Sequence, residues 1–593
     1  MQSYRQYRAV ESAVRKQLEV CPDWKQRVIG QGVERNQQHQ TPHGALLMPG
    51  VRLIDHTDNH GNPRSVFLVD WESEHDPLNP RKFSLRTRIM ATLNVSALAF
   101  AVSASSSIES AVIAQSSAEY HVSEVVASLF TAIFLLGFAA GSLVSGPLSE
   151  ILGRNAVYTI STSLFMLFIM GSGLSPNISA KLVCRFLAGV CGCPPLTCAG
   201  GTVADIWDPL EKTLSFPGYA ILSFGGAILS PVVASYMGQK TLSWRWVNWI
   251  VLIMAGLVLS LIVFLQPETF SPLLLRWRAK HLRQITGDPR FQSKMDLDQT
   301  SIVSRIATAC TRQFTLAVRE PIILLLALYM TILYIVLFTF FDGYSYIFRD
   351  VHHLSQPLTN IVWVAMYVGI MLAAFLVPLM YWRHQQDMRP SAQDHDMERS
   401  LDEAKSIIQP EDRLWYAMIG APAIPISLFW MGWTDYVSQV FPPTETLHYL
   451  EFFLFFHLFP FFSSLSPIRL EYGIKQLIEN PPISQESISV WSPILGSSLF
   501  GFGSICLFIS CYMYVIDAYE VYAASALGFM TISRYCAAGG MTVVGIPFYK
   551  NMGVQWTLTV LGIISAVMVP VPYAFWKYGT VIRGWSRFAV SGN

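Results

Sequence analysis

The segment GPLSEILGRN, Gly146 to Asn155, is a charged, glycine-punctuated turn between two apolar segments that are each long enough to cross a bilayer. Glycine near both ends of the segment would let two helices and their connection approach closely, and a proline would stop the preceding helix. The two charges would stand at a membrane face. These features favour a hinge between moving helices. The residues that define this gating turn are Gly146, Pro147, Glu150, Gly153 and Arg154.

The composition places the chain among polytopic membrane proteins. Of its 593 residues, 52% are apolar and 14% are charged, whereas soluble domains are roughly a quarter charged. A net charge of +1 gives no excess of bases for binding nucleic acid. Most of the nine cysteines fall in apolar segments, so neither a disulfide framework nor a metal site is readable. The polar N-terminus does not read as a cleavable signal peptide.

Twelve apolar segments have about the 20 residues needed to cross a hydrocarbon core. The predicted spans of the first half lie near residues 89–112, 124–145, 156–174, 179–203, 216–237 and 247–266. Those of the second half lie near 321–346, 358–381, 413–433, 489–515, 521–547 and 554–576. This six-plus-six pattern predicts an all-α membrane fold built from two bundles around a central cavity.

Basic residues between the spans predict the topology. The connection after span six carries nine lysines and arginines, so the positive-inside rule makes it cytoplasmic, and an even number of preceding spans puts the N-terminus on the same side. The N-terminal tail is polar and without sustained periodicity, which predicts a largely flexible segment. The predicted organisation is a cytosolic tail (1–87), a six-span bundle (88–267), a cytoplasmic central loop (268–320), a second six-span bundle (321–576) and a cytosolic tail (577–593).

The stretch from 434 to 488 does not fit a short connection between spans. It includes LEFFLFFHLFPFFSSL (Leu450 to Leu465), whose apolar character resembles that of a span. A thirteenth span would move the basic C-terminal tail to the outer face, and Glu451, His457 and Pro460 disfavour insertion. We interpret the stretch as an atypical insertion at the outer interface, with an extra span or a gene-model artefact as alternatives.

Several sequence blocks resemble those of the major facilitator superfamily, and within it the fungal twelve-span drug:proton antiporter branch. The resemblance covers about residues 69 to 585 except the insertion. It implies alternating access between two bundles and coupling to protons. The blocks are DPLNP (76–80), GPLSEILGRN (146–155), RFLAGVCGCPPLTCAGGTVADIW (185–207), WRWVNWI (244–250), PETFSPLLLRWRAKHLRQITGD (267–288), EDRLWYAMIGAPAIPISLFWMGW (411–433) and VIDAYEVYAASAL (515–527).

The chain departs from the family pattern at two places. The family's turn usually ends in two bases, whereas here Arg154 is followed by Asn155. Span five of the antiporters typically carries a Gly-Pro pair and further glycines; here Gly225 and Gly226 precede Pro231, which follows a serine. The antiport direction is therefore less firmly implied than the fold.

Three residues inside the spans are candidates for proton coupling or substrate binding. Arg185 lies about six residues inside span four, roughly 9 Å deep at about 1.5 Å per residue. The resemblance supports a role in coupling, while the alternative is a side chain that reaches back to the outer interface. Glu109 in span one and Asp342 in span seven are the acids that would exchange a proton; each is alternatively an acid wetted at a helix end.

Two further sites follow from short patterns. Within the gating turn, Glu150 and Arg154 are predicted to pair across helix ends and to hold the outward-open state. Asn177-Ile-Ser179 matches a glycosylation sequon on a predicted outer loop, although it lies very close to the membrane.

The predicted function is proton-coupled export of a small amphiphilic organic molecule, such as a drug, toxin or secondary metabolite. The sequence predicts no cofactor, because no phosphate-binding loop is present and the proton gradient would supply the energy. We expect a monomer in the plasma membrane, with both termini cytoplasmic, whose partners are the substrate, protons and lipid. The alternatives are uptake or antiport of a polar nutrient or polyamine and, more remotely, a membrane-embedded enzyme, for which no histidine or nucleophile cluster is visible.

Overall fold

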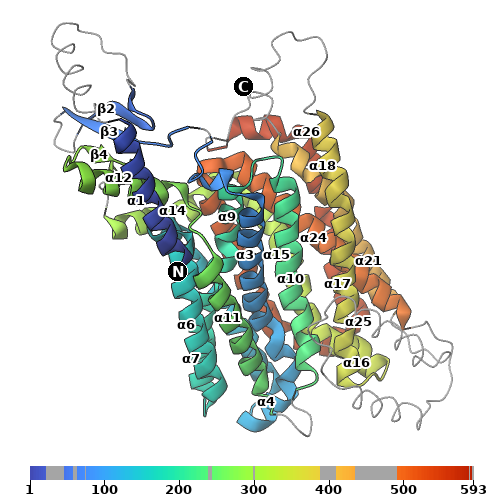
Figure 1. The fold of residues 1–593 in the computed structure, drawn as a ribbon. Coiled ribbons are helices and arrows are strands. Elements are labelled where there is room, and N and C mark those ends of the chain that lie inside the picture. The colour runs from blue at the N-terminus through green and yellow to red at the C-terminus, as the bar shows by residue number, and fades with distance from the viewer. Residues whose placement is uncertain are drawn as a thin grey trace.

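Long helices form the body of the structure, and a small sheet sits at one end (Figure 1). The computed structural model describes residues 1–21, 46–57, 63–73, 75–237, 243–297, 301–387, 409–434, 490–586 and 588–589. The end that carries the sheet and α26 (Pro570–Trp585) is called the sheet end. The opposite end, which carries α4 (Ile113–Tyr120), is called the α4 end.

The first half contributes six crossings of the bundle. Serine caps start two of them: the hydroxyl of Ser84 accepts from Thr87 N, and that of Ser123 accepts from Val126 N. The crossings are α3 (Leu85–Ser107) continued by η2 (Ile108–Val112) and α4; α5 (Glu124–Leu152); α6 (Arg154–Leu174); α7 (Ile178–Gly192) with α8 (Pro194–Thr197) and α9 (Ala199–Ile206); α10 (Lys212–Ala234); and α11 (Trp246–Leu265).

The second half also crosses six times. The crossings are α15 (Pro321–Tyr344) with η3 (Ser345–Val351); α16 (Gln356–Ile361), α17 (Trp363–Leu372), η4 (Ala373–Phe375) and α18 (Leu376–Asp387); η5 (Pro410–Leu414), α20 (Trp415–Gly420) and α21 (Ala423–Trp433); α24 (Trp491–Tyr519) with η8 (Glu520–Tyr522); and α25 (Ala523–Met568) with α26, which together cross twice.

The last crossing pair turns at a glycine. Within the described residues, eleven helical segments are long and apolar enough to span a membrane, and the last of them runs from Ala523 to Trp585. Gly553 interrupts it with φ 75° and ψ 169°, a conformation that glycine adopts without a steric cost. Arg583 returns to the sheet end, where it pairs with Glu411 at 2.8 Å. The segment therefore supplies two antiparallel crossings, which makes twelve and confirms the two-bundle fold.

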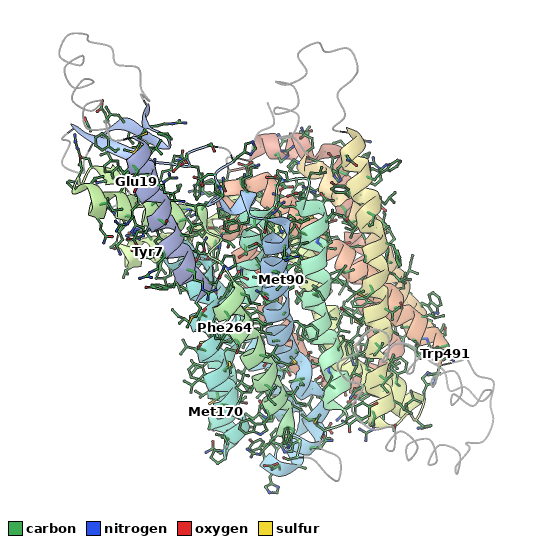
Figure 2. All side chains as sticks on the ribbon, viewed as in Figure 1. Tyr7, Glu19, Met90, Met170, Phe264 and Trp491 are labelled. Carbon is green, nitrogen blue, oxygen red and sulfur yellow. The ribbon has the colours of Figure 1, made fainter. Side chains whose placement is uncertain are left out.

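Apolar side chains cover the outer surface of the bundle. Figure 2 shows Met170 on α6 and Phe264 on α11 at this surface, where they are 39% and 57% exposed. Contiguous exposure of large apolar side chains is costly in water and is what a helix facing lipid presents. The outer faces of the helices therefore form the lipid contact of a multi-pass membrane protein.

The N-terminal segment and the central loop build one folded unit at the sheet end. Helix α1 (Gln2–Val20) packs on α12 (Ser271–Thr286), and the antiparallel strands β1 (Leu46–Met48), β2 (Val51–Thr57) and β3 (Pro63–Val69) are joined by β4 (Phe291–Gln292). The pairing of β3 with β4 is parallel, with Phe67 opposite Phe291. We call these elements the sheet unit. The central loop also contains α13 (Lys294–Leu297) and α14 (Ile302–Arg319).

The sheet unit has its own core and a buried arginine. Its apolar centre includes Val14, Phe67 and Leu282. Arg278 is buried in the same unit and donates to Asp76 Oδ2 at 3.1 Å and to Gln17 Oε1 at 2.9 Å. The prediction of a largely flexible tail is therefore wrong for the described part of residues 1–87, because α1 and the hairpin bury apolar faces against the central loop.

Three further expectations need correction or fall outside the described residues. Pro147 does not stop its helix: α5 continues through it to Leu152. Gly146 lies in the same helix with open space beside it, so it permits no close approach. The interpreted insertion at 434–488 lies outside the described residues except for Thr434.

Candidate functional site

A cavity lies between the two bundles. Its walls come from α3, α8 and α10 in the first half and from α15, α24 and α25 in the second, so neither bundle forms it alone. It leaves about 30 Å³ for the centres of water molecules, which admits water but no drug-sized molecule in this conformation. The lining residues are Ser103, Ser106, Leu196, Tyr219, Ser223, Phe224, Ala227, Tyr334, Leu337, Phe338, Phe508, Arg534 and Tyr535.

Polar contacts between the bundles close the structure on both sides of the cavity. At the α4 end, Gln356 Nε2 donates to Ala111 O at 2.5 Å. At the sheet end, Lys212 Nζ pairs with Asp517 at 3.1 Å, and Arg413 Nε pairs with the same carboxylate at 2.7 Å. Lys212 belongs to the first half of the chain, while Asp517 and Arg413 belong to the second.

The sheet-end contacts form a latch across the two bundles. Arg413 also donates to Thr213 Oγ1 at 2.5 Å and to Pro209 O at 2.8 Å, so one guanidinium holds both halves. The partners of Asp517 could not be predicted from the sequence, because they lie about 100 and 300 residues away along the chain. We define the latch as Lys212, Thr213, Arg413 and Asp517.

Neutralising the latch carboxylate is expected to loosen the sheet end. In Asp517→Asn, Lys212 and Arg413 would face each other without the charge that they share, so separation of the bundles should become easier. We expect a cysteine pair placed across this end to lose crosslinking yield by at least about tenfold, which corresponds to about 1.4 kcal/mol. The matched control is Glu150→Gln at the same end, which should keep the yield; equal yields for both variants contradict the latch.

Arg185 is buried rather than reaching back to the interface. Its guanidinium donates to Ser105 O at 2.9 Å, to Ser105 Oγ at 3.3 Å and to Phe130 O at 3.2 Å. Its carbon atom Cζ lies 4.5 Å from the ring centre of Phe134. The three bonds tie α7 to α3 and α5, so the side chain holds three crossings of the first bundle together.

Glu109 forms an ion pair that the sequence did not predict. Lys181 Nζ donates to its Oε2 at 2.9 Å, and both side chains are almost completely buried. Lys181 also lies 4.0 Å from the ring centre of Trp244. Arg185 acts on Glu109 electrostatically without a hydrogen bond to it. The structure thus brings Glu109 and Arg185 into one cluster, and the spacing of Lys181 four residues before Arg185 was the available signal.

Replacing Arg185 by alanine is expected to abolish transport while leaving protein in the membrane. The change removes the three hydrogen bonds that tie α7 to α3 and α5, together with a charge that stabilises ionised Glu109, so the cluster loses its arrangement. Substrate transport and surface labelling, measured on the same cells, separate loss of transport from loss of protein in the membrane. Arg185→Lys is the control; normal transport by Arg185→Ala contradicts a role in the mechanism.

Asp342 lies apart from that cluster, on α15 of the second bundle. Its side chain is 7% exposed, and its Oδ2 atom has no hydrogen-bond partner in the described part of the chain. Oδ2 lies so close to Gly545 on α25 that a Cβ there would stand 2.6 Å from it. The charged group that acts on it across the bundles is Glu124, a like charge at the start of α5. Among described residues no cation pairs with Asp342.

The gating turn is held by Arg154 and by backbone donors. Arg154 Nε pairs with Asp205 on α9 at 3.1 Å, and its Nη1 donates to Ser149 Oγ at 2.5 Å. Gly201 makes room for the guanidinium, since a Cβ there would lie 2.5 Å from Nη2. Glu150 forms no ion pair with any described residue. The partner of Arg154 is therefore Asp205.

Glu268 caps the start of α6 beside that turn. Its carboxylate accepts from Arg154 N at 3.0 Å and from Asn155 N at 3.2 Å, as an anion does at a helix N-terminus. Burial raises the pKa of this carboxyl, and its backbone N–H donors oppose the rise. Gly153 has φ 92° and its missing Cβ leaves space for Glu268 and Leu273, so this glycine, unlike Gly146, allows the close approach.

The departure at Asn155 has a structural reason. Asn155 is buried, and its Nδ2 donates to Gln266 O at 2.5 Å, which ties the start of α6 to the end of α11. At this position the chain has the short amide side chain of Asn155, whereas the family usually has a base. Gln6 completes the arrangement from the sheet unit, because its Nε2 donates to Glu268 O and its Oε1 accepts from Glu268 N.

The antiporter-like segment of span five is a close helix crossing. A Cβ on Gly226 would stand 2.1 Å from Phe100 O on α3, and one on Gly225 would stand 2.9 Å from the ring of Tyr367 on α17. Helix α10 continues through Pro231 to Ala234. The preceding Ser230 hydroxyl lies 2.8 Å from that of Ser107. These contacts place α10 tightly between the first bundle and the second.

Asn177 lies on the exposed surface at the start of α7. Its Oδ1 accepts from Ala180 N at 3.0 Å, which caps the helix. The side-chain nitrogen, where a glycan would be attached, is not the atom that caps. Glycosylation at this sequon stays a prediction.

Comparisons with known proteins agree with this architecture. The family model described as Major Facilitator Superfamily matches residues 94–475. The MFS-type transporter kojT of Aspergillus flavus is 42% identical over 542 residues, which cover 91% of this chain and 86% of kojT. The uncharacterized transporter mfs2 of Schizosaccharomyces pombe is 31% identical over 523 residues, which cover 88% of this chain and 84% of mfs2.

A solved structure gives the same fold at low identity. The proton:xylose symporter XylE superposes with a TM-score of 0.54 at 13% identity, over 84% of this chain and 96% of that chain. A likeness at this identity concerns the fold alone.

Twelve crossings in two bundles around a shared cavity define a membrane transporter. The chain belongs to the Major Facilitator Superfamily. Members of this family are transporters for small molecules, so the alternative of a membrane-embedded enzyme is wrong.

Proposed function

We propose that the protein exports small amphiphilic organic molecules in exchange for protons by alternating access. The observation that supports alternating access is the central cavity, which both bundles line and polar contacts between the bundles close on either side. Rocking of the bundles about this cavity would expose it to one side of the membrane at a time. Aromatic rings and hydroxyls in its walls suit a molecule with both apolar and polar parts.

Asp342 is the residue that supports proton coupling. An ionised carboxylate at this place would be buried with no cation of the described residues paired to it, which is a costly arrangement. Taking up a proton removes that cost, and rocking that wets the site would allow the proton to leave. Glu109 is less suited to this role because Lys181 already compensates its charge.

Export is the direction that the overall resemblance of the sequence blocks to the antiporter branch supports. We place the sheet end in the cytoplasm, because the nine bases of the central loop lie there, and the protein in the plasma membrane as a monomer. Both termini are then cytoplasmic. The polyamine alternative is disfavoured by the cavity, whose lining contains Arg534 and no carboxylate.

Inside-out membrane vesicles from cells that overproduce the protein test the proposal. A panel of labelled amphiphilic compounds is offered with the vesicle lumen acidified, and accumulation is compared with that in vesicles from cells lacking the protein. We expect at least one compound to accumulate only while the pH gradient exists and to leak out after a protonophore is added. Accumulation that ignores the protonophore contradicts proton coupling, and gradient-driven loss of compound from the lumen contradicts export.

A further inference from the structure

Arg534 carries a positive charge into the middle of the bundle. It lies 11 residues into α25, about 16 Å from the start of that helix at about 1.5 Å per residue, and is 2% exposed. A guanidinium at such depth is costly unless other groups compensate its charge and satisfy its N–H donors. Counting from Ala523 puts Arg534 at mid-depth of its crossing.

The other buried cations of the described chain have the partners that Arg534 lacks. Arg185 uses all three guanidinium nitrogens on oxygen atoms. By contrast, Nε and Nη1 of Arg534 have no hydrogen-bond partner, and within the described residues no carboxylate pairs with it. The buried ion pairs for comparison are Arg154 with Asp205, Lys181 with Glu109, Arg278 with Asp76, Arg413 with Asp517 and Arg583 with Glu411.

Aromatic rings surround the guanidinium. Its carbon atom Cζ lies 4.6 Å from the ring centre of Tyr334, 4.8 Å from that of Tyr535, 5.3 Å from that of Tyr512 and 5.6 Å from that of Phe508. Rings at these distances attract a cation through their faces. They leave the N–H groups of Nε and Nη1, which point along the plane of the guanidinium, without acceptors among the described residues.

The same rings meet aromatic side chains of the first bundle. Phe224 on α10 lies 4.8 Å from Phe508 and 6.2 Å from Tyr334, measured between ring centres. The rings thus converge on the cavity from both bundles and touch one another in this closed conformation, so a planar molecule that enters when the bundles separate would touch rings of both. A molecule that neutralises Arg534 would be in position to couple its own binding to the closure of the bundles.

The opposite wall of the cavity offers hydroxyls and no negative charge. Ser103 and Ser106 on α3 and Ser223 on α10 line it, and no Asp or Glu is among the lining residues. An organic cation would meet an uncompensated positive charge there. An anion would find a fixed guanidinium whose planar donors match the two oxygens of a carboxylate.

We propose that the cavity is a binding site for small aromatic organic anions, in which Arg534 binds the acidic oxygens and the rings of Tyr334, Tyr535 and Phe508 flank the aromatic part. This inference rests on the proposed function, because it names the substrate class of the same cavity. It also gives a reason for the unusual burial of Arg534: the ligand supplies the acceptors and the negative charge that the protein lacks. Release of the ligand would leave the cavity in the costlier state, which favours rebinding or closure.

Calorimetric titration of the purified full-length protein in lipid nanodiscs at pH 7 tests the inference. The probes share one phenol ring: 4-hydroxybenzoate is an anion, 4-hydroxybenzamide is neutral and tyramine is a cation. We expect the anion to bind wild-type protein with a Kd at least about tenfold lower than that of the amide, and tyramine to bind most weakly. In Arg534→Gln the preference for the anion should disappear, and in Arg534→Lys it should be partly kept.

A second variant covers the case in which Arg534→Gln does not fold. Ser223→Asp leaves Arg534 in place and adds a carboxylate to the facing wall, so it should weaken binding of 4-hydroxybenzoate at least about tenfold and improve binding of tyramine. Ser223→Asn is its matched control and should bind the anion like the wild type. Equal affinity for anion and amide in the wild type, an anion preference that survives Arg534→Gln, or no binding of 4-hydroxybenzoate at millimolar concentration overturns the inference.

These titrations use no proton gradient. Anion binding without gradient-driven transport would contradict the proposed export and leave the substrate class standing. Gradient-driven export confined to neutral or cationic compounds would support the proposed export and contradict the anionic substrate class.

Discussion

Asp342→Asn is expected to reduce gradient-driven accumulation by at least about tenfold, which corresponds to about 1.4 kcal/mol of lost coupling. The amide keeps the shape of the side chain beside Gly545, so the close contact between α15 and α25 should survive. It cannot take up and release a proton, so the step that the gradient drives is lost. Exchange of unlabelled for labelled substrate across the membrane needs no net proton movement and should continue.

Gradient-driven accumulation and substrate exchange are both measured in the same vesicles. Accumulation is followed with and without a pH gradient, and exchange is followed with substrate on both sides and no gradient. Glu124→Gln is the matched control, because it removes an exposed carboxylate that acts on Asp342 and should keep gradient-driven accumulation. Loss of exchange together with accumulation in Asp342→Asn would mean that the residue holds the structure or the substrate and does not carry the proton.

Lys181→Met is expected to destabilise the folded protein by about 3–5 kcal/mol, because it leaves the Glu109 carboxylate buried without its partner. The amino group also packs against the rings of Trp244 and Phe130, at 4.0 and 4.4 Å from their centres. Methionine fills similar space, so most of the effect should come from the stranded charge and little from packing. The amount of monodisperse protein in detergent should fall sharply.

The double variant Glu109→Gln with Lys181→Met separates charge from packing. Removing both charges should restore most of the stability, since buried ion pairs often contribute little net stability. Thermal unfolding followed by size-exclusion chromatography measures the wild type, both single variants and the double variant, and the coupling follows from the four values. A double variant that is as unstable as the sum of the single ones would contradict the ion pair as the cause.

The bundle could be predicted from the sequence because its signals are local. Apolar length and basic connections define each crossing without reference to any other part of the chain. The turn at Gly153 could also be predicted, since glycine favours such turns, and its φ of 92° agrees with this. The prediction that Pro147 ends its helix was wrong, because proline is tolerated inside a membrane helix where neighbouring groups satisfy the freed backbone groups.

The sheet unit was missed although local signals existed. Residues 51–57 (VRLIDHT) and 63–69 (PRSVFLV) are rich in β-branched and apolar residues and lie on either side of NHGN, which is a hairpin pattern. The prediction of a flexible tail followed the polar composition of the surrounding residues and did not take this hairpin pattern into account. The strand that completes the sheet, β4, comes from more than 220 positions later, and such pairing leaves no trace in a single sequence.

The candidate site was predicted in its parts but not in its pairings. Arg185, Glu109 and Asp342 are buried, as a functional charge within a span should be, yet Lys181 as the partner of Glu109 was not anticipated. Arg534 was not among the predicted site residues, because only the structure shows that four rings surround it and that no carboxylate of the described residues pairs with it. Burial and partners depend on how helices face one another, which hydropathy does not report.

The attachment of the sheet unit has a practical consequence for imaging this protein. Small transporters embedded in a micelle are hard to align in electron micrographs because little of their mass projects from the membrane. Here Gln6 binds the backbone of Glu268, whose carboxylate in turn binds the start of α6, so the projecting unit is fastened to the first bundle at a defined point. An antibody fragment raised against the sheet unit would therefore serve as a fiducial marker that reports the orientation of the first bundle in every particle.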